Sequence, residues 1–146
     1  MDQGEHTMKT RNQKIGQKGV AVLELSIILP FFVLLVFGTI EFGVMFYNKQ
    51  VITNASREGV RAGITGADQA TIKNIVDAYC ANKLINLNGN NQLQADDIVV
   101  SGPDVNNDLT VDVSFTNTFL LAQIIGLTDT TLSARTIMRM EPGSGP

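Results

Sequence analysis

Few residues in this chain of 146 amino acids have the chemistry that catalysis or metal binding requires. Cys80 is the single cysteine and His6 the single histidine, which excludes an internal disulfide, a CxxC motif and most metal or nucleophile sites. Asp96 and Asp97 are adjacent carboxylates, but neighbouring residues of an extended segment point to opposite faces. We therefore find no catalytic constellation, and we expect neither enzyme activity nor a cofactor.

A second acidic segment, Asp104–Asp112, resembles the opening of a calcium-binding loop. Its sixth position is Leu109 instead of glycine, and its twelfth is Phe115 instead of glutamate. A hairpin turn built from Asn and Asp accounts for the same residues. We therefore predict a turn here and no metal site.

The remaining candidate is a carboxylate inside an apolar segment. Residues 20–40 read VAVLELSIILPFFVLLVFGTI, and sixteen of these 21 residues are apolar. About 20 such residues span a bilayer as a helix, whereas a cleavable secretory signal has an apolar region of about 7–15 residues. Glu24 in such a helix costs about 2.5–3.5 kcal/mol on insertion scales. It is therefore either a functional group or a carboxylate that reaches water at the favourable start of the helix.

The charges on either side of this segment predict its orientation. The first 19 residues carry a net charge of +2, and the chain from Val20 onward has seven basic and twelve acidic residues. Because excess Lys and Arg mark the cytoplasmic side, we predict a cytoplasmic N-terminus and an extracytoplasmic C-terminal domain. The sequence has no strongly basic region of the kind that binds nucleic acid, so we expect no nucleic-acid partner.

Around this border the residues form an ordered series that resembles a known family. Gly19 followed by Glu24 resembles the class III signal of type IV pilins and pseudopilins, in which a prepilin peptidase cuts after the glycine. The series continues as in the TadE-like proteins of the Tad/Flp pilus system. Its further matching segments are Pro30, Glu41–Gly43, Asn54–Ala62 and, near the C-terminus, Leu132–Glu141. One departure is Leu25, where the family usually has an aromatic residue.

The resemblance implies cleavage between Gly19 and Val20 and four regions. These are a cytoplasmic leader (1–19), a transmembrane helix (20–42), a helix extension (43–64) and a small extracytoplasmic α+β domain (65–146). It implies a single-pass protein of the bacterial inner membrane that supports Tad/Flp pilus biogenesis, in adhesion or secretion, and that can enter a surface pilus. The implied partners are prepilin peptidase, other Tad/Flp pilins or pseudopilins, the inner-membrane assembly platform and membrane lipid.

A second interpretation is a signal-anchored single-pass membrane protein that keeps residues 1–19. Its extracytoplasmic domain would then bind a ligand or another protein. Under this interpretation Gly19 and Glu24 are incidental.

Within the membrane helix, two residues have predicted roles. After cleavage Val20 has a free amine, and Glu24 lies about one helical turn away. In an assembly Glu24 can pair with the terminal amine of a neighbouring subunit and so set the register. Pro30 predicts a kink or a locally melted turn, because it removes a backbone donor.

The helix extension has two predicted faces. One is apolar at three- and four-residue spacing and consists of Val44, Tyr47, Val51, Ala55, Gly59 and Ala62. Ala55, Gly59 and Gly63 also follow a small-x3-small pattern, which lets another helix or strand approach closely. The other face is either solvated, with a weak Glu58–Arg61 pair, or a docking stripe. We call it the polar stripe; it consists of Asn54, Arg57, Glu58 and Arg61.

The rest of the chain predicts about three antiparallel strands and one or two helices. Asp68 is a candidate cap of a helix whose apolar positions are Ile72, Ile75, Val76, Tyr79 and Leu84. Segment 86–97 reads as a loop. The expected strands cover 98–100, 109–115 and 131–140, and Phe119–Leu127 reads as a loop or helical turn near the membrane or the core. Such a minimal core needs the long helix as a wall.

Overall fold

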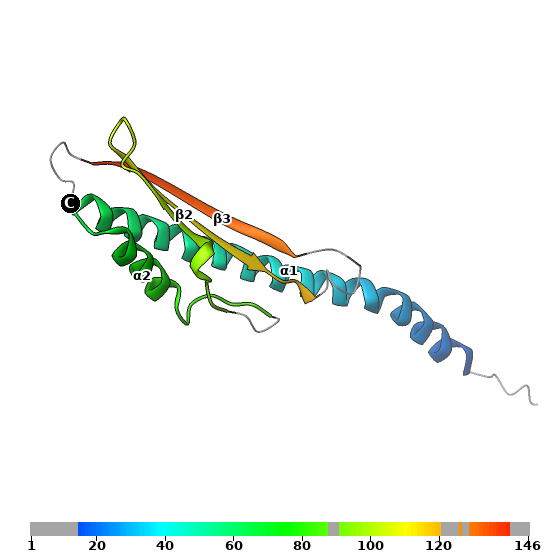
Figure 1. Ribbon diagram of the computed structural model, residues 1–146. Coiled ribbons are helices and arrows are strands. Elements are labelled where there is room, and N and C mark those ends of the chain that lie inside the picture. Colours follow the sequence, from blue (N-terminus) through cyan, green and yellow to red (C-terminus); the bar gives the residue numbers. More distant parts are fainter. Residues whose placement is uncertain (1–14, 88–90, 121–125, 127–128, 141–146) are drawn as a thin grey trace, which may run out of the picture. The chain divides into compact units, whose positions relative to one another are not determined.

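The computed structural model describes residues 15–87, 91–120, 126 and 129–140. In these residues the elements, in chain order, are helix α1 (Ile15–Ile64), helix α2 (Gln69–Cys80), the 3-10 turn η1 (Ala95–Asp97) and strands β1 (Ile98–Ser101), β2 (Asp108–Asn117) and β3 (Thr130–Arg139) (Figure 1). The predicted α+β class is confirmed, with a long apolar N-terminal helix followed by a small domain of three antiparallel strands and a helix. The chain divides into two compact units, Met1–Val36 and Phe37–Pro146.

In the first unit, α1 exposes every side chain from Gly19 to Val36. A helix that is apolar all round belongs in a core or a membrane, and here the described part of the chain leaves it uncovered. By length and composition this helix can cross a membrane. α1 stays α-helical through Pro30, so of the two predicted alternatives the melted turn was wrong and the kink stays a prediction. A proline removes one hydrogen bond, to the carbonyl of Ser26, and the turns on either side keep theirs.

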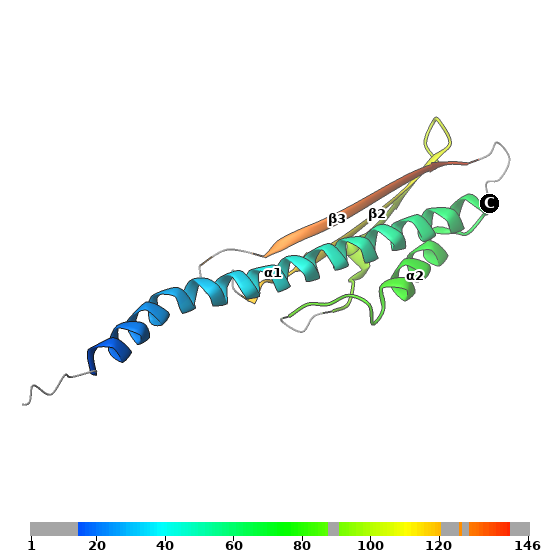
Figure 2. The same cartoon turned by 180° about the vertical axis from the view of Figure 1, so that it is seen from behind.

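The second unit has two layers. The sheet has the order β1-β2-β3 and is antiparallel throughout. In β2 the odd-numbered residues Leu109 to Asn117 are buried and the even-numbered ones face outward. α1 and α2 therefore cover one face of the sheet, and the other face is open to solvent. In both of the opposite views of Figures 1 and 2, β2 and β3 run beside the C-terminal half of α1.

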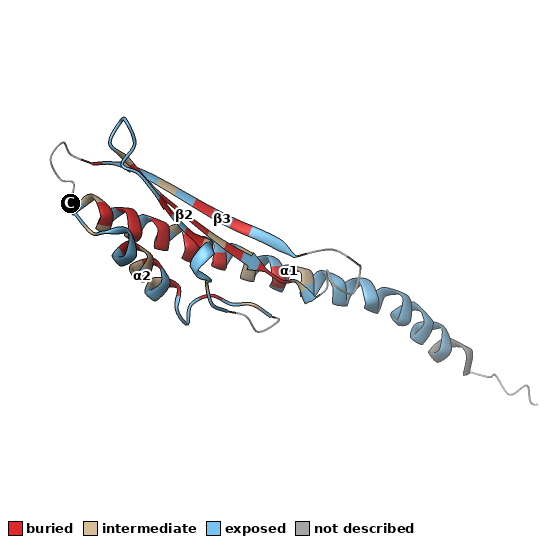
Figure 3. Cartoon of the chain, in the orientation of Figure 1, coloured by how far each residue is buried: buried red, intermediate tan, exposed pale blue. Residues whose placement is uncertain are grey.

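The core lies between α1, α2 and the inner face of the sheet (Figure 3). Ile52 and Val60 of α1 are fully buried, whereas Tyr47 is 45% exposed and Ala62 is only partly buried. The expected apolar face of the helix extension was therefore too narrow: it contains the buried Val51, Ala55 and Gly59 but misses Ile52 and Val60, and it was wrong for the exposed Tyr47. The reason is that α1 meets both α2 and the sheet, so its buried face is broader than a single stripe.

The smaller elements agree closely with the predicted ones. Asp68 caps α2 by accepting a hydrogen bond from the backbone N–H of Thr71 at 3.0 Å. Leu84 is buried but lies beyond the end of the helix, and the loop predicted over 86–97 contains η1 at its end. Of the segment predicted as a loop or turn over Phe119–Leu127, residues 121–125 and 127 lie outside the described residues.

Candidate functional site

Gly19, Val20 and Glu24 all lie in α1 with their surfaces exposed. A Cβ atom added at Gly19 would meet nothing within 4 Å. Glycine inside a helix costs about 0.5–1 kcal/mol relative to alanine. The packing of this chain therefore gives no reason for a glycine at position 19.

Gly59 and Gly63 differ from Gly19 in this respect. A Cβ at Gly59 would lie 2.6 Å from Cγ2 of Val76 and 3.4 Å from Cγ2 of Ile72. A Cβ at Gly63 would collide with Cδ2 of Leu109 and lie 2.8 Å from Cδ1 of Ile72. These two glycines, with the fully buried Ala55 one turn earlier, lie where α1 packs against α2 and β2 of its own chain. This face is therefore occupied within the subunit.

All four residues of the polar stripe are exposed. Within the stripe, Nη1 of Arg61 lies 3.9 Å from Oε2 of Glu58, and these side chains are 73% and 49% exposed. Exposed pairs at such a distance contribute little stability. The polar stripe therefore lies on the surface of α1, away from the core, and its one ion pair among the described residues does little for the fold.

A buried amide network, which the sequence analysis missed, joins α1 to two distant segments. The Asn48 side chain donates through Nδ2 to the carbonyl of Ile85 at 2.6 Å and to Oδ1 of Asn117 at 2.7 Å. Its Oδ1 accepts from the backbone N–H of Ile85 at 2.9 Å. Asn48 is fully buried and Asn117 is 2% exposed. The available signal was an asparagine at helical spacing among apolar residues, since an amide can both donate and accept.

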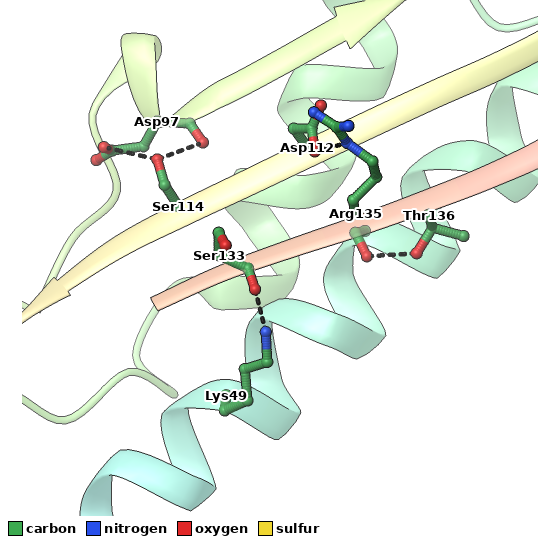
Figure 4. Close-up of polar contacts among 8 residues, drawn as sticks. Lys49, Asp97, Asp112, Ser114, Ser133, Arg135 and Thr136 are labelled. Atoms are coloured by element: carbon green, nitrogen blue, oxygen red, sulfur yellow. Dashed lines mark hydrogen bonds and ion pairs between the residues drawn. The ribbon is translucent and has the colours of Figure 1, made fainter. Parts of the chain in front are cut away.

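Two further contacts hold α1 to β3 (Figure 4). The Ser56 hydroxyl lies 2.7 Å from Oγ1 of Thr136 and donates to the carbonyl of Thr53 at 2.9 Å. Lys49 donates through Nζ to the carbonyl of Ser133. Because β3 is an edge strand, this lysine covers part of an edge that would otherwise be open to another strand.

The outer face of the sheet carries two cross-strand ion pairs. Nε of Arg135 lies 2.7 Å from Oδ1 of Asp112 (Figure 4), and Nε of Arg139 lies 3.2 Å from Oδ1 of Asp108. Both pairs are directly opposite in the register of β2 and β3. The hydrogen bond and the charge of Asp112 raise the pKa of Arg135. The pairs match β2 to β3 on the exposed face and leave no free cluster of one charge there.

The acidic segment after β1 forms the expected turn. Oδ1 of Asp104 accepts from the backbone N–H groups of Asn106 at 2.8 Å and Asp108 at 2.9 Å. These hydrogen bonds, chiefly the one from Asp108, lower the pKa of the Asp104 carboxyl. Among the described residues no group of three or more His, Cys, Asp or Glu side chains could hold a metal ion. The carboxylate of Asp104 thus serves the hairpin.

Two other features have some chemical potential. An open groove of about 350 Å³ lies beside α2, where Lys73 and Asp77 face Gln94 and Ile98. Cys80 is buried, and burial, followed by the charge of Asp77, raises the pKa of its thiol to about 11. A thiol with so high a pKa is a poor nucleophile at neutral pH. Among the residues that line the groove, no nucleophile is paired with a base.

Residues 19–61 match the model of a protein family described as TadE-like protein. This segment of the chain is TadE-like. The predicted resemblance is thereby confirmed over these residues. No curated protein and no solved structure gives a significant match. Together with the apolar helix, the TadE-like segment indicates a membrane protein related to the Tad pilus, a class of proteins that are generally not enzymes.

The TadE-like segment begins at Gly19 and ends at Arg61. Some of its residues are accounted for by the fold of this subunit, as Ala55 and Gly59 are by their packing against α2 and the sheet. Others are not: Gly19 has open space around it, and the residues of the polar stripe lie on the surface. The segment therefore contains a set of residues that contribute little or nothing to the fold of the single subunit.

Proposed function

We propose that this protein is a non-enzymatic, membrane-anchored minor pilin or pseudopilin that supports the biogenesis of a Tad/Flp pilus, in adhesion or secretion. The observation that carries the proposal is the TadE-like segment, which starts at Gly19 and runs along α1, whose first part is exposed and apolar. Gly19 and Glu24 lie on this helix at the spacing of a class III signal, and the fold does not require a glycine at position 19.

In the proposed mechanism, prepilin peptidase removes residues 1–19 on the cytoplasmic side of the inner membrane. The new amine of Val20 then lies near the membrane boundary, about one turn from the carboxylate of Glu24. Pairing of Glu24 with the amine of a neighbouring subunit neutralises two charges that the bilayer penalises. Because such a pair forms only at one axial offset, Glu24 sets the register between subunits.

Outside the membrane, the two faces of α1 have different roles in this proposal. The sheet and α2 occupy the face that contains Ala55, Gly59 and Gly63, so this face is unavailable to other subunits. The polar stripe is accessible. We assign it the contact with other Tad/Flp pilins or with the inner-membrane assembly platform.

N-terminal processing tests the proposal. The full chain is expressed with and without prepilin peptidase, extracted from membranes and analysed by intact mass and N-terminal sequencing. We expect a chain that starts at Val20 only when the peptidase is present. Gly19→Val should block the cut, whereas Gly43→Val, at another α1 glycine with nothing within 4 Å of its Cβ position, should not. If the wild type keeps residues 1–19 while a control pilin is cut, the signal-anchored alternative is correct.

Glu24 is tested separately, because processing and assembly are different steps. Glu24→Ala should insert into the membrane as the wild type does but lose co-purification with partner pilins. Ser26→Ala is the matched control, since Ser26 is also exposed on this helix and its hydroxyl bonds only locally, to the carbonyl of Val22 at 2.7 Å. Recovery of partners by Glu24→Ala at the wild-type level would rule out the register role.

A further inference from the structure

Large exposed apolar side chains gather at one end of the second unit, around the buried amide network of Asn48, Ile85 and Asn117. Five of them lie within three residues of a member of this network, and their exposed fractions range from 39% to 65%. They are Phe46, Tyr47, Ile85, Leu87 and Leu120. We call this set the apolar collar. It combines residues from α1, from the segment after α2 and from the segment after β2.

The network holds these three segments at one level of α1. Asn48 bonds both the N–H and the carbonyl of Ile85, and it also bonds the side chain of Asn117. The Asn86 side chain adds a bond to the carbonyl of Thr116 at 3.3 Å. These hydrogen bonds therefore fix the backbone of the three segments, and the collar side chains are exposed from that fixed backbone.

Most of the sequence around the collar lacks charge. Residues 84–95 and 113–128 contain no Asp, Glu, Lys, Arg or His. The ionised pairs of the sheet lie farther along β2, at Asp112 and Asp108, five and nine residues before Asn117. Within three residues of the network the exposed charges are those of Lys49 and Lys83, both basic. An exposed apolar surface is costly in water and suits a contact with an apolar phase, and lysines at its border can reach the polar side of that phase.

α1 itself displays no charge between Glu24 and the collar. Glu41 is the one ionisable residue in this stretch, and it is 6% exposed. The next exposed charge along the helix is that of Lys49. The 23 residues from Leu25 to Tyr47 rise about 35 Å as an α-helix, compared with about 30 Å for the hydrocarbon core of a bilayer. Phe46 and Tyr47 thus fall at the boundary where aromatic side chains are favoured.

We propose that the apolar collar lies in the interfacial layer of the bilayer, so that the second unit rests on lipid at this end. The inference rests on the proposed membrane anchoring by α1. Lipid is the occupant that the observations favour, because the chain leads from the apolar helix directly into the collar without an intervening exposed charge. Ile85, Leu87 and Leu120 then add a second and a third segment to the membrane contact that α1 begins.

The test uses the full chain in vesicles of phosphatidylcholine and phosphatidylglycerol, with a fluorophore on a single introduced cysteine. Ile85→Cys and Leu120→Cys report on the collar. Ile137→Cys, at an exposed apolar residue on the outer face of the sheet, is the matched control, and Leu25→Cys reports on the membrane helix. The native Cys80 is buried and stays unlabelled in the folded protein, so a labelling ratio of one fluorophore per chain verifies the fold.

Lipids that carry a nitroxide in the headgroup should quench the probes at positions 85 and 120 several-fold more than the probe at 137. Lipids with the nitroxide in the acyl chain should quench the probe at 25. Equal, weak quenching at 85, 120 and 137, with strong quenching at 25, would overturn the collar inference and leave membrane anchoring intact. Collar probes that escape lipid quenching and become exposed on dilution of the protein would show that a protein partner covers the collar, which also overturns it. Absence of quenching at 25 would refute membrane anchoring, and the inference with it.

Discussion

The Gly59→Ala substitution adds one methyl group to α1 where the helix faces α2. Two effects of opposite sign result. Alanine favours the helix by about 0.5–1 kcal/mol over glycine. The new Cβ, however, would lie 2.6 Å from Cγ2 of Val76 and 3.5 Å from Cγ1 of Val111.

The collision should be the larger effect. Val76 is fully buried and lies in the middle of α2, where a valine has one strongly preferred χ1 rotamer and cannot turn its methyl group away. Overpacking of such a site costs about 1–3 kcal/mol. We therefore expect a net loss of about 1–2 kcal/mol in the free energy of unfolding, which lowers the ratio of folded to unfolded protein about 5- to 30-fold.

Cys80 supplies the assay, because this single cysteine is 2% exposed in the same core. The rate at which a thiol reagent modifies it in detergent-solubilised protein, measured against denaturant concentration, reports the opening of the domain. Gly43→Ala is the control, since nothing lies within 4 Å of its Cβ position, and it should raise the stability slightly. In a Val76→Ala background, Gly59→Ala should lose most of its effect. The reasoning would be refuted by a Gly59→Ala protein as stable as the wild type.

Three further predictions concern the polar groups of the second unit. Asn48→Ala should lower the free energy of unfolding by about 2–4 kcal/mol, because it removes the hydrogen bonds that the buried Asn117 amide and the Ile85 backbone make with Asn48. Thermal unfolding followed by circular dichroism measures this loss, with Asn54→Ala as the exposed control. Hydrogen bonds from Thr71 lower the pKa of Asp68 below 3.8, so the contribution of Asp68 to stability should be present above that pH and disappear as the pH falls through the lowered pKa. Asp68→Asn should therefore weaken the fall in the free energy of unfolding at acid pH. An unchanged fall would contradict the cap. The Cys80 thiol, with its pKa raised to about 11, should react with iodoacetamide at pH 8 far more slowly than the unfolded chain does, and equal rates would contradict its burial.

Local patterns were sufficient to predict most of the fold. The cap at Asp68 followed by apolar residues at helical spacing predicted α2, and alternation from Leu109 to Phe115 predicted β2. These signals depend on a residue and its near neighbours. The predicted strand bounds therefore differ from the observed ones by at most two residues at either end.

The contacts that join distant segments could not be predicted in the same way. Asn48 and Asn117 are 69 residues apart, and Ser56 and Thr136 are 80 apart. Their pairing requires the approach of α1 to the sheet, which no local pattern specifies. The same reason explains why the predicted apolar face of α1 was too narrow: periodicity finds one stripe, whereas α1 packs against two partners at once.

The TadE-like match covers most of α1 but none of the elements that pack against this helix. The match ends at Arg61, whereas α2 and the sheet, which bury the C-terminal part of α1, begin after residue 64. On the helix, the contact with these elements is made in part by small residues, including Ala55, Ser56 and Gly59. Such residues allow close approach, and an added Cβ at Gly59 would already meet Val76 of α2. The polar stripe on the exposed side of the helix has three long, charged side chains, Arg57, Glu58 and Arg61, which this subunit leaves accessible. Under the proposed function, the inner face of α1 holds the chain's own domain, and the polar stripe on the outer face is left for contacts with other subunits.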